Sequence, residues 1–119
     1  MSDNKQKGQK GEDIACEYLI NAGYEIKKRN FHFGREGEID IIAEKDNYLV
    51  FVEVKFRTNN SYGDPLESIT PKKAKTLQRA AEGYMYVNKF HDKPCRIDVI
   101  IVDFRNSEPA INHIENAVY

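Results

Sequence analysis

The sequence predicts a mixed α/β fold, an α+β mixed sheet with helices on its faces, in the order helix–three strands–helix–strand. Apolar residues recur at helical spacing near the N-terminus and again after residue 70. Three runs rich in Ile, Val and Phe lie between these two segments, and a fourth follows the second helix. The 119 residues are the size of one small domain, so we expect a single domain over 1–119.

The first helix is expected over residues 8–22, after a polar tail over residues 1–7 that we expect to be mobile. Gly23 follows this helix as a stop signal. Glu12 lies on or beside the apolar stripe, where a carboxylate is costly without a partner. It is either an acid favoured in the first helical turn or part of a functional site.

Short apolar runs bounded by turn residues predict the strands. These strands are expected over residues 24–33, 38–44, 48–57 and 95–104, with a short edge strand around 111–114. A loop over 58–69 leads to a second helix that runs from Pro71 to about Asn88, with Thr70 as its N-cap. The strand over 95–104 is apolar enough to be buried on both faces.

Charged residues interrupt the apolar hairpin formed by the second and third strands. Because side chains alternate between the two faces of a strand, a two-residue turn at Asp46–Asn47 makes one face of this hairpin wholly apolar. On the other face, Asp40 then stands directly opposite Glu53. Like charges in that position destabilise a sheet, and such breaks of a local rule tend to mark functional sites.

Two carboxylates at this spacing can share Mg²⁺ or Mn²⁺ through their oxygen atoms, so Asp40 and Glu53 are the candidate metal ligands. A bound Mg²⁺ stabilises the charge of a phosphoryl transition state, and Lys55 is placed to position the nucleophile or stabilise anionic charge. Glu12 is a further candidate ligand or orienting group. The plain alternative is an ordinary cross-strand charge pattern that contributes little.

Two further acids are assigned to structure. In the predicted register Glu38 stands opposite Lys55, so we expect Glu38 to pair with Lys55 or Arg57 rather than to bind metal. Asp98 is expected to be a structural acid held by Arg96 or by backbone donors.

Basic side chains at the start of the second helix are candidates for nucleic-acid binding. Their two alternatives are a solvated helix face and a phosphate-contacting surface. The residues are Lys72, Lys73, Lys75 and Arg79. Arg57 lies past Lys55 on the same face and is a candidate bidentate donor to phosphate.

Composition limits the classes of function. The formal net charge is −1, so any nucleic-acid binding must rest on local patches. Cys16 and Cys95 lie far apart, and the three histidines have no ligand spacing, so neither a disulfide framework nor a zinc site is expected. Reduced thiols in a cytoplasmic protein are expected instead. The polar N-terminus has no signal-peptide pattern, and no apolar run is long enough to span a membrane.

Asp40 followed by Glu53-Val54-Lys55 resembles the signature of the PD-(D/E)xK, restriction-endonuclease-like nuclease superfamily, whose core has the element order predicted above. Ile39 stands where the nominal proline of that signature would be. A fuller pattern looks like the YraN family of small bacterial proteins. It comprises Gly11-Glu12, Gly37 to Ile42, Phe51 to Arg57, Tyr62-Gly63 and Arg96 to Val99.

The YraN family's relation to archaeal Holliday junction resolvases implies a catalytic set of Glu12, Asp40, Glu53 and Lys55. The first functional hypothesis is therefore a Mg²⁺- or Mn²⁺-dependent, endonuclease-like hydrolase of DNA phosphodiester bonds, with branched or junction DNA as a candidate substrate. The second is a non-catalytic nucleic-acid-binding module with the same fold, and the third is an interaction protein whose charges are structural. Related resolvases act as dimers, which leaves a homodimer open.

Overall fold

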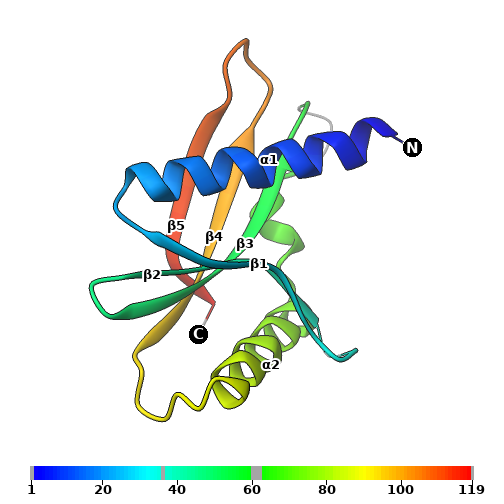
Figure 1. Cartoon of the computed structure of the whole chain (residues 1–119). Coiled ribbons are helices and arrows are strands. Elements are labelled where there is room, and N and C mark those ends of the chain that lie inside the picture. The colour runs from blue at the N-terminus through cyan, green and yellow to red at the C-terminus, as the bar shows by residue number, and fades with distance from the viewer. Residues whose placement is uncertain (1, 36, 60–62, 119) are drawn as a thin grey trace.

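The structure, a computed structural model, describes residues 2–35, 37–59 and 63–118. These residues form helix, three strands, helix and strand in the predicted order, followed by an edge strand (Figure 1), so the α/β, restriction-endonuclease-like fold class is confirmed. The elements are α1 (Ser2–Asn21), β1 (Glu25–Phe33), β2 (Gly37–Lys45), β3 (Tyr48–Arg57), the 3₁₀ helix η1 (Pro65–Ser68), α2 (Pro71–Val87), β4 (Cys95–Asp103) and β5 (Ala110–Val118). Neither helix in this part of the chain is long and apolar enough to cross a membrane.

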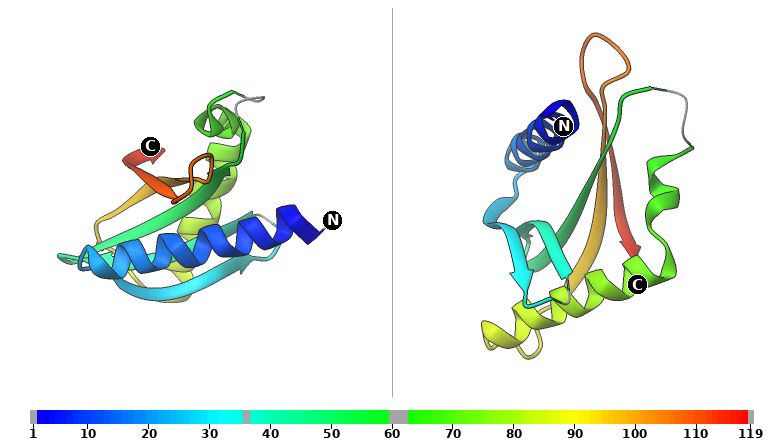
Figure 2. Two further views of the ribbon diagram at one scale, coloured as in Figure 1. Left: turned by 90° about the horizontal axis from the view of Figure 1, so that it is seen from above. Right: turned by 90° about the vertical axis from the view of Figure 1, so that its right-hand side faces the viewer.

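The sheet has the order β1-β2-β3-β4-β5. β3 and β4 are parallel, and the other neighbouring strands are antiparallel. A parallel pair needs a long connection, which here contains η1 and α2. The two α-helices lie on opposite sides of the sheet (Figure 2), so each face has its own apolar cluster.

The faces of β3 divide as the alternation of its side chains predicts. Val50 and Val52 pack with Leu19 on the α1 side of the sheet. Leu49 and Phe51 pack with Leu77 of α2 on the other side. All of these side chains are fully buried, and each such burial stabilises the fold by about 1.5–3 kcal/mol.

The ends of the chain differ most from the prediction. α1 begins at Ser2, so residues expected in a mobile tail are helical. Lys and Gln are good helix formers, and a helix extends readily from turns that are already packed. At the other end, β5 covers all of Ala110–Val118 rather than only residues 111–114. It forms an antiparallel ladder with β4. The sequence pattern of this segment alone does not reveal that pairing.

The β2–β3 hairpin closes as predicted, through Asp46 and Asn47. Both residues have positive φ angles, 52° and 67°, which two-residue hairpin turns require. Lys45 pairs with Tyr48, and the predicted register holds as far as the pair Ile41–Val52.

A buried polar network joins β4, β5 and α1. Asp98 is fully buried and accepts hydrogen bonds from Arg96 Nε at 3.0 and 3.1 Å and from the Asn116 backbone N–H at 2.9 Å. His113 Nε2 lies 2.7 Å from Asp98, and His113 Nδ1 lies 3.0 Å from the hydroxyl of Tyr18. Burial alone would raise the pKa of Asp98, but these hydrogen bonds outweigh it and lower that pKa. Asp98 is thus the structural acid predicted.

Because its pKa is lowered, Asp98 stabilises the fold above its unfolded pKa of about 3.9, and this contribution is lost as pH falls through the folded value. We expect Asp98→Asn to lower the free energy of unfolding by about 3 kcal/mol at pH 7, because Arg96 then loses the buried carboxylate that it contacts. The deficit should shrink below pH 4. Urea denaturation at several pH values measures it. A loss at pH 7 no larger than that of Asp103→Asn, which breaks an ion pair with Arg105 at the surface, would contradict this role.

Gly83 marks the closest approach between α2 and the end of β1. A Cβ atom added there would lie 2.4 Å from ring carbons of Phe33. We expect Gly83→Ala to lower the free energy of unfolding by about 1–3 kcal/mol through overpacking. The control is Gly8→Ala in α1, where the nearest contact would be 3.8 Å and helix propensity predicts a neutral or stabilising effect. Equal urea midpoints for the two variants would refute the overpacking.

Candidate functional site

The site lies where β2 separates from β3. Their ladder ends at the pair Ile41–Val52. Beyond it, the backbone N–H of Val54 donates to Asp40 Oδ2 at 2.8 Å, so a carboxylate takes the place of a main-chain acceptor. The sequence predicts that Asp40 pairs with Glu53 and that Glu38 pairs with Lys55 in this ladder. Neither backbone pair is present.

Asn30 of β1 accounts for the local geometry. It lies across from Asp40, between the pairs Arg29–Ile41 and Phe31–Ile39, and has a φ of +53°. On one side of it, Arg29 contacts α1, and on the other side Phe31 packs toward α2. Ile39 likewise packs on the α2 side, whereas Ile41 packs on the α1 side. Regular alternation would place these two side chains on the same apolar face of the hairpin, so that expectation is wrong for Ile39.

Sequence reasoning missed the role of Asn30. The available signal was an asparagine inside a predicted strand. Asn is depleted in strands and tolerates positive φ better than most residues, so it marks a place where the alternation of faces can reverse.

Asp40 and Glu53 form a carboxyl pair in which Asp40 is half-buried and Glu53 is buried. Glu53 is only 5 % exposed. Burial raises the pKa of Asp40 to about 8, and the charges of Glu53 and Glu12 and a hydrogen bond with the Glu53 carboxyl add to this rise. The Val54 N–H opposes it. The structure thus brings the two predicted acids together through their side chains, although their backbones are not paired.

Two ammonium groups neutralise Glu53. Lys55 Nζ lies 3.4 Å and Lys73 Nζ lies 3.3 Å from the same Glu53 oxygen, Oε2. Lys55 follows on the same strand, whereas Lys73 comes from the first turn of α2. Of the predicted basic run, Lys73 therefore reaches the carboxyl pair, while Lys72, Lys75 and Arg79 are exposed along the helix.

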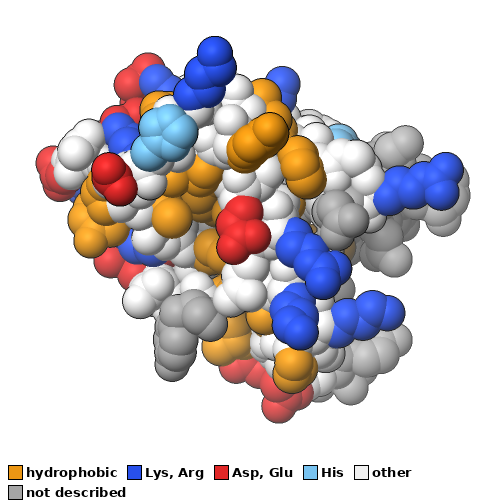
Figure 3. All heavy atoms as spheres, turned by 90° about the horizontal axis from the view of Figure 1, so that it is seen from below, with side chains coloured by type: hydrophobic (Ala, Val, Ile, Leu, Met, Phe, Trp, Pro, Cys, Tyr) orange, Lys and Arg blue, Asp and Glu red, His pale blue; other side chains and the backbone are white. Residues whose placement is uncertain are grey.

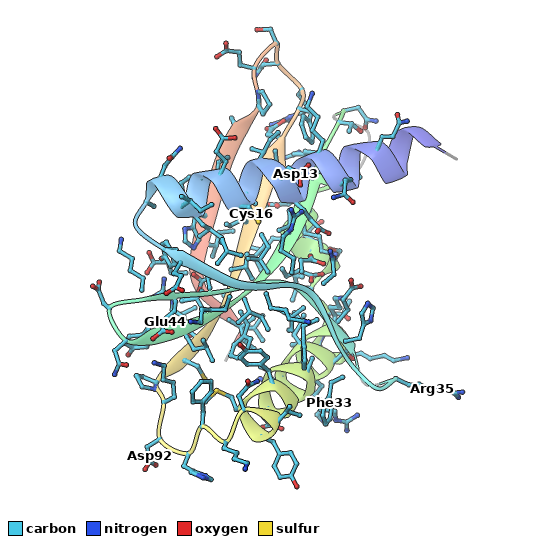
Figure 4. The ribbon with its side chains drawn as sticks, in the orientation of Figure 1. Asp13, Cys16, Phe33, Arg35, Glu44 and Asp92 are labelled. Atoms are coloured by element: carbon cyan, nitrogen blue, oxygen red, sulfur yellow. The ribbon has the colours of Figure 1, made fainter. Side chains whose placement is uncertain are left out.

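Glu12 of α1 lies at the border of the pair. Its Oε1 accepts a hydrogen bond from Arg29 at 3.4 Å, and the Asn30 amide nitrogen, turned toward the carboxylates, donates to it at 3.2 Å. Burial raises the pKa of Glu12, and Arg29 opposes that rise. Asp13, the next residue of α1 (labelled in Figure 4), also binds Arg29, at 2.9 Å.

Glu38 does not pair with Lys55 or Arg57, so that prediction is wrong. Its Oε2 lies 3.5 Å from His32 Nε2 and 3.3 Å from the Asn30 amide nitrogen. The reason is the separation of the two strands, which carries Glu38 away from β3. Asn30 thus bridges Glu12 and Glu38 instead.

Arg57 at the end of β3 lines a pocket of about 400 Å³ together with Lys55, Thr58 and Ser68. Its Nε is buried and has no hydrogen-bond partner within the described part of the chain. A buried guanidinium nitrogen without a partner is costly, and an anion in the pocket would satisfy it. Tyr62, which belongs to the family pattern, lies outside the described residues.

The carboxyl pair fits one kind of metal site. Within residues 2–35, 37–59 and 63–118, no three Asp, Glu, His or Cys side chains gather closely enough to hold a metal ion by themselves. Mg²⁺, however, is commonly held by one or two carboxylates, with water and substrate phosphate completing its shell. Asp40 and Glu53 match such a two-carboxylate site, with Lys55 and Lys73 balancing their charge.

The raised pKa of Asp40 predicts how the stability of the metal-free protein depends on pH. Between about pH 4 and pH 8 the folded chain holds a proton that the unfolded chain releases, so this group destabilises the fold as pH rises. Asp40→Asn removes the charge and keeps an acceptor for the Val54 N–H. We therefore expect it to raise the free energy of unfolding by at least about 1 kcal/mol at pH 8, with the gain vanishing near pH 4.

Urea denaturation in EDTA tests this expectation. The control is Glu44→Gln, because Lys93 lowers the pKa of Glu44 and its loss should destabilise the fold at pH 8. If Asp40→Asn lost stability at pH 8 as the control does, the carboxyl pair would not be strained by burial.

The chain is similar to many bacterial proteins along nearly its whole length. It is 42 % identical over 114 residues to a UPF0102 protein of Dehalococcoides mccartyi, covering 96 % of this chain and 93 % of that protein. It is 43 % identical over 114 residues to one of Clostridioides difficile, covering 96 % and 97 %, and 38 % identical over 120 residues to one of Phocaeicola vulgatus, covering 100 % and 97 %.

Among solved structures, the chain is similar to the structure of Pyrococcus furiosus SfsA in complex with Ca²⁺, with 18 % identity and a TM-score of 0.40. The match covers 98 % of this chain and spans 65 % of SfsA. Residues 11–102 match the model of the Uncharacterised protein family UPF0102. That segment contains Glu12, the carboxyl pair, both lysines and the whole of α2. The chain therefore belongs to the UPF0102 family, which is the YraN family that its motifs resemble.

Proposed function

We propose that this UPF0102 protein is a metal-dependent nuclease that hydrolyses phosphodiester bonds of DNA, with branched or junction DNA as its candidate substrate. The observation that carries the proposal is the carboxyl pair of a buried Glu53 and a half-buried Asp40, with Lys55 beside it. A folded protein gains no stability from two acids placed this way, so their placement points to chemistry.

Asp40 and Glu53 are the proposed ligands of Mg²⁺ or Mn²⁺. Such an ion would supply the positive charge that stabilises a pentacoordinate phosphoryl transition state. The proposal accounts for the high pKa of Asp40, since a cation would replace the proton that Asp40 otherwise holds.

The remaining residues are proposed to bind and orient the substrate. Lys55 lies close enough to Glu53 to hold a water molecule for attack on phosphorus or to stabilise the developing negative charge. Glu12 orients the site through Arg29 and Asn30. Arg57 would donate to a backbone phosphate in the pocket that it lines, because its buried Nε has no hydrogen-bond partner among the described residues.

The N-terminal half of α2 is the proposed surface for further phosphates. Lys73 already extends to Glu53, and the neighbouring Lys72, Lys75 and Arg79 are exposed. Seen from below, Lys and Arg side chains gather on one part of the surface (Figure 3), which provides the local positive patch that the net charge of −1 does not. A homodimer would present two such surfaces to a two-fold branched substrate.

We also propose that the protein is cytoplasmic. Cys16 is buried in the α1-side core and Cys95 lies on β4 at the surface, and both are free thiols. Free cysteines suit a reducing compartment.

A second candidate is the non-catalytic nucleic-acid-binding module. It is favoured by the two ammonium groups on Glu53, which already balance its charge, and by the lack of a third candidate metal ligand among the described residues. Binding of DNA in Ca²⁺, without cleavage in Mg²⁺ or Mn²⁺, would support this alternative. Binding through phosphates should weaken steeply with salt.

The decisive experiment is cleavage of end-labelled linear duplex, single-stranded, flapped and four-way DNA in Mn²⁺. We expect Asp40→Asn to reduce cleavage by about 100-fold or more, as loss of one charge-stabilising group typically does. The matched control is Asp46→Asn, the same substitution in the turn of the same hairpin, which should cleave at the wild-type rate.

Cleavage that survives Asp40→Asn would contradict the assignment. If neither Asp40→Asn nor Glu53→Gln changed metal affinity, cleavage or DNA binding, the charges would be structural, as in an interaction protein.

A further inference from the structure

One exposed side of α2 changes character along its length. Lys72, Lys75, Arg79, Glu82 and Tyr86 are spaced by three or four residues, so they follow one side of the helix. All five are exposed, and Tyr86 is 81 % exposed. The stripe is basic where it adjoins the carboxyl pair and aromatic at its far end.

The basic half of this stripe opposes the local electrostatics of the helix. The N-terminus of a helix carries a partial positive charge and favours acids, yet the first turn of α2 has none and has lysines instead. Lys72 on the stripe therefore gains nothing from the partial charge at the start of the helix. An anionic ligand that lies along this side would offset the unfavourable placement of this charge.

The aromatic end contains a shallow hollow. Phe33 from the end of β1 and Tyr86 from α2 line it together with Arg79, Glu82 and Gly83, and its volume is about 320 Å³. Figure 4 shows Phe33 against α2, and the missing side chain of Gly83 is what allows this close approach. Two aromatic side chains from different elements thus border one open space beside a cation.

We propose that this hollow binds an unpaired nucleobase of a DNA substrate whose phosphates lie along Lys72, Lys75 and Arg79. The inference rests on the nucleic-acid function proposed above and narrows its substrate to DNA with unpaired nucleotides next to a duplex. Aromatic side chains bind unpaired bases of any sequence by stacking. Glu82 repels a phosphate beyond Arg79, so this end of the stripe suits an uncharged base better than more backbone.

The length of α2 sets the spacing. Tyr86 comes thirteen positions after Lys73, which is about 20 Å along a helix axis. That distance corresponds to about six base pairs of duplex. The unpaired base would therefore lie several nucleotides from the carboxyl pair, as it can in flapped or forked DNA.

A tryptophan at this position reports on stacking directly. The chain has no tryptophan, so Tyr86→Trp introduces a single tryptophan whose fluorescence can be excited selectively. The probes are a blunt duplex and the same duplex with a four-nucleotide overhang, both in Ca²⁺. We expect the overhang to quench the fluorescence at saturation and the blunt duplex not to. Val87→Trp is the matched control, because Val87 is exposed beside Tyr86 but lies off the stripe.

Affinity provides the second measurement. We expect Tyr86→Ala to weaken binding of the overhang duplex by about 5- to 100-fold, the effect of losing one stacked base, and to leave binding of the blunt duplex unchanged. Tyr86→Phe should retain the affinity for the overhang, and Tyr86→Leu should lose it. Equal affinities of Tyr86→Leu and Tyr86→Phe for the overhang duplex would overturn the proposal. A hollow that binds apolar side chains of a protein partner needs no aromatic ring at this position.

The outcomes separate this inference from the nuclease proposal. Equal quenching by both duplexes, with cleavage that depends on Asp40, would overturn only the base-binding hollow. Quenching specific to the overhang, with no cleavage of any substrate, would keep the hollow and overturn the nuclease. Failure of both DNAs to bind would overturn both.

Discussion

The hydrogen bond from the Val54 N–H to Asp40 is the interaction on which the site depends. It closes the gap where β2 leaves β3 and keeps a carboxyl group within reach of Glu53. Burial raises the pKa of Asp40, and the Val54 N–H opposes that rise because it donates to the carboxylate. The nearby basic and amide groups can be understood as compensation for this one buried acid pair.

That compensation comes from parts of the chain that are far apart in sequence. β1 contributes Arg29 and Asn30 to Glu12, and β3 contributes Lys55 to Glu53. α2 contributes Lys73, although its main role in the fold is to connect the parallel strands β3 and β4. The packing of α2 on the sheet therefore also determines the charge of the site. Gly83 and Phe33 are part of that packing, because the missing side chain of Gly83 lets the Phe33 ring lie against α2.

The sequence alone predicts the elements and the identity of the paired acids well. Regular alternation in β3 predicts its two faces, and the turn at Asp46 predicts the hairpin register, because both follow from local geometry. It does not predict the reversal of faces at Asn30, since a positive φ at one residue leaves no periodic trace. Nor does it predict the contact between Lys73 and Glu53, which depends on how α2 crosses the sheet. The error for Glu38 came from extending an ideal ladder past the point where it ends.

The order of the elements determines the order in which the charged residues of the site come together during synthesis. The β2–β3 hairpin closes through a two-residue turn and depends on local contacts, which form quickly. β4 joins β3 only after the intervening η1 and α2 have been made, a non-local step of higher contact order. A nascent chain emerging from the ribosome would thus pair Asp40 with Glu53 before Lys73 arrives. During that interval the two acids are more exposed to water. Their full electrostatic repulsion develops only when the second helix docks and buries them.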